Sequence, residues 1–96
     1  MRADYDSEAN ALSIDLIDVP RWDDGEEIDD TYCNVALSQG RPANVELLNP
    51  HDHLDLLAVV AERFALDPLA LRIVAEAALA VPDRPVTLDI GAREAA

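Results

Sequence analysis

Hydrophobic and polar residues alternate along the first half of the chain. In residues 11–17, which read Ala-Leu-Ser-Ile-Asp-Leu-Ile, every second side chain from Leu12 onward is large and hydrophobic. A period of two is typical of a strand with one buried face and one face in water. Shorter patterns predict further strands at residues 3–5, 26–28, 32–37 and 44–48. We therefore expect an antiparallel β-meander of four to six strands over residues 1–50.

Turn-forming residues separate these strands. Residues 6–10 (Asp-Ser-Glu-Ala-Asn) predict a hairpin loop, residues 18–25 a surface loop, and residues 38–41 (Ser-Gln-Gly-Arg) a tight turn. Pro42 follows the last turn and has no backbone N–H to donate, so we expect it to lie outside any central strand.

The hydrophobic period becomes helical near Asp52, which is a suitable N-cap. Apolar residues from Leu54 to Phe64 recur at helical spacing and predict a first helix that runs to about Ala65. Asp67 and Pro68 then form an N-cap and a first helical position. They predict a second helix over 69–81 that is apolar on nearly every side.

Residues 85–90 alternate again and predict a final strand. The whole pattern predicts a single α+β domain over residues 1–96, in which the two helices of residues 51–82 pack on one face of the sheet. The side chains that we expect in its core are Leu12, Ile14, Leu16, Val35, Leu37, Val45, Leu47, Leu57, Phe64, Ile73 and Val74.

The charge of the chain narrows the range of its partners. Twenty acids, seven arginines and no lysine give a net charge of −13. This balance argues against nucleic acids and anionic membranes, because both need clustered cations. No apolar run approaches the ~20 residues of a membrane span. The acidity has two readings: a halophilic or high-GC source, or a surface that meets a basic protein partner.

The single cysteine, Cys33, rules out an internal disulfide and favours the reducing cytoplasm. Its position within a predicted strand indicates a core residue. No motif pairs a nucleophile with a base, and with three glycines there is no phosphate-binding loop, so we expect no cofactor. Glu8 and Glu46 are the acids that the sheet would have to bring together for acid–base chemistry. An enzyme is the weaker interpretation.

Two groups of residues are candidates for a functional site. The first is an acidic run beside the only tryptophan, made of Trp22, Asp23, Asp24, Glu26 and Glu27. We expect a solvated loop with the indole folded inward to cap the core. The alternative is an exposed tryptophan that, among acids, anchors a basic partner. The second is His51, His53 and Asp55, whose side chains are potential ligands of a divalent cation. The alternative is a helix start flanked by surface histidines.

The second helix has more apolar surface than a sheet of this size covers. We therefore expect the protein to form a homodimer.

Residues 5–14, Tyr-Asp-Ser-Glu-Ala-Asn-Ala-Leu-Ser-Ile, resemble the opening of the domain of unknown function 2283 family of short bacterial proteins. That family typically begins Tyr-Asp-Pro-Glu-Ala-Asp-Ala-Leu-Tyr-Ile and continues with an acidic strand, a Gly-Arg hairpin and a closing strand. Glu26–Asp29, Gly40-Arg41 and Val45–Leu48 occupy these places here, so the likeness covers about residues 3–50. Ser7, Asn10 and Ser13 depart from the pattern, and so does the Pro-Ala-Asn segment before the closing strand.

The resemblance implies an antiparallel sheet followed by a helix, and no reaction. Some members of the family look like antitoxin-type partners of small toxins. The sequence thus favours a small acidic cytoplasmic interaction module, and the resemblance implies an antitoxin-like one. The alternative is a metal-binding protein or small enzyme that uses His51 and His53.

Overall fold

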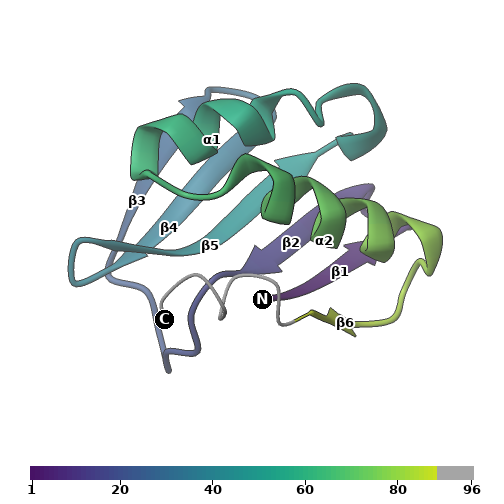
Figure 1. The fold of residues 1–96 in the computed structure, drawn as a ribbon, viewed down its shortest axis with the longest axis horizontal. Coiled ribbons are helices and arrows are strands. Elements are labelled where there is room, and N and C mark those ends of the chain that lie inside the picture. The colour runs from purple at the N-terminus through teal and green to yellow at the C-terminus, as the bar shows by residue number, and fades with distance from the viewer. Residues whose placement is uncertain (89–96) are drawn as a thin grey trace.

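The computed structural model describes residues 1–88 as a six-stranded antiparallel sheet with two helices on one face (Figure 1). The predicted α+β class is confirmed. The strands are β1 (Arg2–Asp6), β2 (Ala11–Asp15), β3 (Asp24–Asp29), β4 (Cys33–Ser38), β5 (Arg41–Leu48) and β6 (Val86–Thr87). The helices are α1 (Leu56–Phe64) and α2 (Pro68–Ala80), preceded by the 3-10 turn η1 (Pro50–Asp52).

The strand order is β3-β4-β5-β2-β1-β6. The hairpin β1–β2 and the meander β3–β4–β5 lie side by side because β2 pairs with β5 rather than with the next strand along the chain. The connection between β2 and β3 therefore runs across to the far edge of the sheet. Consequently β3 and the short β6 form its two edges (Figure 1).

The register between β2 and β5 places hydrophobic residues of the two strands opposite each other in the core. Leu12 lies opposite Leu47 and Ile14 opposite Val45, and all four side chains are fully buried. The helices add the buried residues Leu57, Val60, Ala61, Leu71, Val74, Ala75 and Ala78. The expected core is thus confirmed at Leu12, Ile14, Val35, Val45, Leu47, Leu57 and Val74, while Leu16, Leu37 and Phe64 pack against it half-buried.

Ile73 was expected in the core, and that prediction is wrong. Its side chain is 40% exposed, on the side of α2 that faces away from the sheet. A helix that lies on a sheet buries one stripe of side chains, and in α2 this stripe runs through Leu71, Val74 and Ala78.

The start of α2 is as predicted. The Asp67 carboxylate accepts hydrogen bonds from the backbone N–H groups of Leu69 (2.9 Å) and Ala70 (3.3 Å), and Pro68 occupies the first turn. These bonds satisfy donors that have no partner within the helix.

The predicted start of α1 at Asp52 is wrong. The His53 N–H donates to the carbonyl of Pro50 (3.1 Å) and the Leu56 N–H to that of His53 (3.0 Å), so the chain winds through three-residue turns first. The α-helix begins only at Leu56, and the side chain of Asp55 makes no capping bond.

Three strand boundaries also differ from the prediction. Pro42 lies within the central strand β5, opposite Leu37, where the register between β4 and β5 shifts. The ladder between β5 and β2 extends only to Asn44, so the missing N–H of Pro42 costs no bond in it. β3 begins at Asp24, inside the predicted loop. β6 spans Val86–Thr87, and positions 89–90 of the predicted final strand lie outside the described residues.

The face of the sheet opposite the helices is polar, and one buried amide organises it. Asn44 is 3% exposed, and its side-chain nitrogen donates to Ser13 Oγ and Asp15 Oδ1, both at 2.8 Å. In the described residues 1–88, no helix has the length and apolarity needed to cross a membrane.

The cap of α2 allows a direct test of this description. Asp67→Ala removes both capping acceptors and should lower the free energy of unfolding by about 1 kcal/mol. The matched control is Asp55→Ala, because Asp55 precedes α1 without making a capping bond. This variant should change the free energy of unfolding less. Urea unfolding followed by circular dichroism measures both, and equal losses would contradict the assignment.

Candidate partner-binding edge

Most of the acidic run forms β3, an edge strand of the sheet. β4 pairs with one side of β3, and among residues 1–88 no strand pairs with the other. An edge strand of this kind presents unpaired N–H and C=O groups to solvent. Because Glu26 lies opposite Val35 and Glu27 opposite Asn34, the Glu26 side chain lies on the helix-covered face and that of Glu27 on the polar face.

Glu26 is occupied within the protein. Its carboxylate accepts a hydrogen bond from Arg63 Nε on α1 and forms an ion pair with it. This contact raises the pKa of the Arg63 guanidinium. The pair fastens α1 to β3, so Glu26 is less available to a partner than its position in the sequence indicates.

Asp23 and Asp24 shape the beginning of the strand. The Asp23 N–H donates to the carbonyl of Leu37 (3.0 Å), and the Asp23 carboxylate accepts from the Gln39 N–H at 3.1 Å. Asp24 Oδ1 accepts from the N–H of Gly25 at 2.8 Å. Both carboxylates are exposed and keep oxygen lone pairs directed to solvent.

The other end of β3 carries a β-bulge and a second local turn. The register with β4 shifts between Glu27 and Asp29. Asp29 Oδ1 then accepts from the N–H groups of Thr31 and Tyr32, both at 2.9 Å. These two backbone bonds, that from Thr31 first, lower the pKa of Asp29, and the charge of His53 contributes in the same direction. The carboxylate therefore keeps its charge further into the acid range than a free aspartate.

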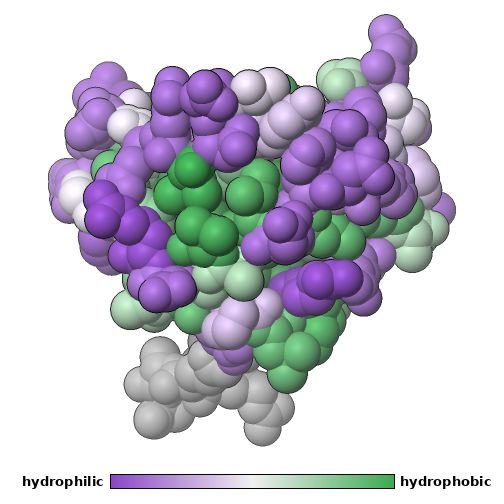
Figure 2. All heavy atoms as spheres, turned by 90° about the horizontal axis from the view of Figure 1, so that it is seen from above, coloured by the Kyte–Doolittle hydropathy of each residue, from purple (hydrophilic) through white to green (hydrophobic). Residues whose placement is uncertain are grey.

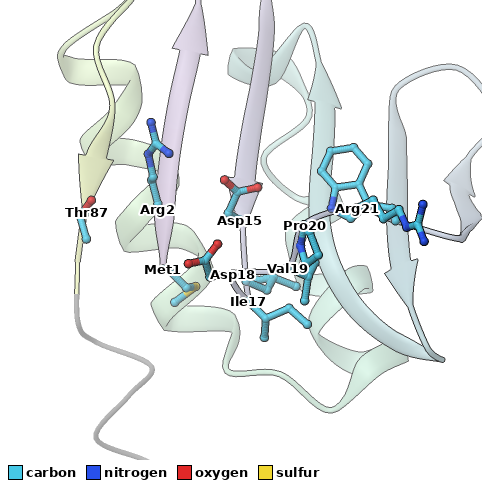
Figure 3. Close-up of a pocket in the computed structure, with 11 residues that line it drawn as sticks. Met1, Arg2, Asp15, Ile17, Asp18, Val19, Pro20, Arg21 and Thr87 are labelled. Atoms are coloured by element: carbon cyan, nitrogen blue, oxygen red, sulfur yellow. The ribbon is translucent and has the colours of Figure 1, made fainter.

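Trp22 is exposed in the segment that leads into β3, and its side chain faces residues of β1 and β2. Its side chain is 52% exposed and lines a cavity of about 640 Å³ on the polar face. Figure 3 shows Arg2 and Asp15, neighbours on β1 and β2, at one side of the cavity and Arg21 at the other. The prediction that the indole folds inward is therefore wrong, and Trp22 is an accessible aromatic surface two residues before β3.

The two histidines pack against tyrosines. The His51 ring meets the Tyr5 ring edge-on, at a centroid distance of 5.6 Å. The His53 ring stacks on Tyr32 at 3.8 Å, and its Nδ1 lies 2.8 Å from the carbonyl oxygen of Asn49. Within residues 1–88, no group of three or more histidine, cysteine or acidic side chains lies close enough together to hold a metal ion. His51 and His53 each pack against a tyrosine ring, and Asp55 is exposed before α1.

Cys33, Glu8 and Glu46 are the other residues that the sequence offered for a chemical role. Cys33 is buried at the start of β4, as expected for a core residue. Burial, with a smaller contribution from the charge of Asp29, raises the pKa of the Cys33 thiol to about 11. Glu46 lies opposite Ser13 in the middle of the sheet, while Glu8 is in the hairpin turn between β1 and β2. These positions do not form an acid–base pair.

The sequence predicted a strand at residues 26–28, but it left Asp23 and Asp24 in the preceding loop and gave no sign of Arg63. The partner of Glu26 lies 37 residues away, and nothing local in the sequence connects the two.

Comparison with protein-family models found no match, and comparisons with curated proteins and with solved structures found no significant match either. The resemblance of residues 3–50 to the domain of unknown function 2283 family stays a prediction.

The raised pKa of Cys33 predicts that the native thiol is inert. An unfolded cysteine titrates near pH ~8.5, so at pH 8 native Cys33 should react with a disulfide reagent at least about a hundredfold more slowly than the urea-unfolded chain. Spectroscopic labelling rates in both states measure this. Equal rates would contradict the buried position.

The packing of the histidines predicts a further result. Zinc at up to ~1 mM should leave the melting temperature unchanged, because a metal raises it only where the folded state binds the ion. Thermal unfolding with zinc and with a chelator is the measurement. A rise that the variant His53→Ala abolishes would revive the metal interpretation.

Proposed function

We propose that the protein is a small interaction module of the bacterial cytoplasm that binds a basic partner protein, in the manner of an antitoxin. The partner contributes an extended segment that adds to β3 as a further strand. The observation that supports this proposal most is the combination of an open sheet edge and an acidic strand in the same six residues.

In strand addition, the backbone and the side chains of the added segment make different contributions to binding. The backbone of an added segment bonds to the free N–H and C=O groups of β3, which provides affinity without regard to sequence. Its side chains alternate between the two faces, so cationic residues at every second position meet Glu27 on the polar face. A basic segment is therefore preferred over a neutral one.

Trp22, two residues before β3 in the chain, supplies an exposed aromatic group on the polar face. Its exposed indole offers a face on which an arginine of the partner stacks, and cation–π contacts of this kind favour arginine over lysine. The excess of acids in the chain adds a long-range attraction that speeds the encounter with a basic protein.

The charge of β3 provides the first test. Removing two charges with Asp24→Asn and Glu27→Gln should weaken binding of a ten-residue peptide of alternating arginine and threonine by about three- to tenfold, in line with exposed charge pairs. The matched control removes two charges with Asp52→Asn and Asp55→Asn, outside the edge, and should weaken binding less. Calorimetric titration at low salt measures both. Equal losses would assign binding to net charge alone.

The geometry of binding is tested with the same peptide methylated at alternate backbone nitrogens. This change keeps every positive charge and removes the donors that strand addition needs. We expect the methylated peptide to lose most of its affinity. Unchanged affinity would overturn strand addition while leaving an acidic docking surface in place.

The natural partner is sought in the product of the adjacent gene. The proposal expects a small basic protein that co-purifies with the chain and is released by the Asp24→Asn, Glu27→Gln variant. Purification from native cells with no bound protein would count against the interaction module.

A further inference from the structure

The helix layer carries a second apolar stripe that the sheet does not cover. On α2, Leu69 is 65% and Ile73 40% exposed, and Ala77 and Ala80 continue the same side of the helix toward its end. Val59 on α1 is 47% exposed. Figure 2 shows hydrophobic side chains gathered in the middle of the surface seen from above, with hydrophilic side chains around them.

Charge sets this layer apart from the rest of the molecule. Residues 1–55 carry fourteen acids and three arginines, a net charge of −11. Residues 56–80 carry three acids and two arginines, a net charge of −1. The chain therefore repels a second copy of itself much more strongly along residues 1–55, which form β1 to β5, than at its helices.

We infer that the helix layer is the contact through which two copies of this chain form a symmetric dimer. The inference is independent of the proposed partner at β3. Electrostatics does not direct a basic partner to the nearly neutral helices. A second acidic copy, in contrast, is repelled less at the helices than at the acidic strands.

The stripe on α2 is also complementary to itself in shape. A two-fold axis at Ile73 brings two α2 helices together antiparallel, with the large Leu69 of each copy opposite the small Ala77 of the other. A large side chain over a small one lets two helices interdigitate closely. The Arg72–Glu76 pair at the margin of the stripe carries both signs and is able to contact its counterpart without net repulsion.

The size of the layer sets the expected strength. α2 has 13 residues and is about 20 Å long at 1.5 Å per residue, so the dimer interface is at the lower end of specific interfaces. We therefore expect dissociation in the micromolar range, and tighter association when salt screens the repulsion between the two acidic chains.

Analytical ultracentrifugation from 1 to 100 µM tests the inference on the whole chain. The wild type should shift from monomer to dimer across this range, and Leu69→Glu or Ile73→Glu should remain monomeric at 100 µM. Both side chains are exposed, so circular dichroism should report unchanged folding. A wild type that is monomeric at 100 µM in 0.5 M salt would overturn the inference.

Two controls separate this contact from general charge effects. Leu48→Glu adds the same charge at a 38% exposed apolar residue on the opposite face of the sheet, and it should dimerise like the wild type. Arg72→Glu should weaken the dimer, and the exchange Arg72→Glu with Glu76→Arg should restore it. Dimers that persist in Leu69→Glu, or that Leu48→Glu disrupts equally, would place the contact elsewhere and overturn the inference.

Discussion

Pairing between β2 and β5 joins the hairpin β1–β2 to the meander β3–β4–β5, which would otherwise be separate pieces of sheet. Leu12 meets Leu47 and Ile14 meets Val45 at its centre, across more than thirty residues of chain, and all four side chains are fully buried. A slip of one residue in this register would turn the hydrophobic side chains of one strand toward water. The hydrophobic face on which both helices rest exists only when the pairing forms in this register.

The same pairing determines where the acidic strand lies. Because β5 occupies the place beside β2, the chain between them has to cross to the outer edge before it returns through β3 and β4. The acids of β3 are thereby placed at the boundary of the sheet, where carboxylates remain hydrated. The helices, which carry almost no net charge, lie on one face of the sheet. Sheet topology has separated the charged part of the surface from the nearly neutral part.

Local patterns were sufficient for much of this fold. Alternation in residues 11–17 predicted β2, and Asp67-Pro68 predicted the start of α2, because each depends on neighbours in the sequence. The exposure of Ile73 and the strand order depend on contacts between distant segments, which periodicity does not record. At Pro42, local chemistry and distant contacts act together. Proline has no N–H to donate within a ladder, and the ladder between β5 and β2 ends at Asn44, so Pro42 lies in a central strand without losing a bond to β2.

The candidate site was likewise predicted only where local sequence is sufficient. The acidic run was identified from composition, and its role as an edge strand follows only from the sheet. The bulge at Glu27 and Asp29 has a consequence for aggregation. Two identical β3 edges would place carboxylates against carboxylates along an interrupted ladder, which blocks the strand-to-strand stacking from which amyloid grows. The acidity of β3 therefore disfavours direct pairing between the β3 edges of two copies.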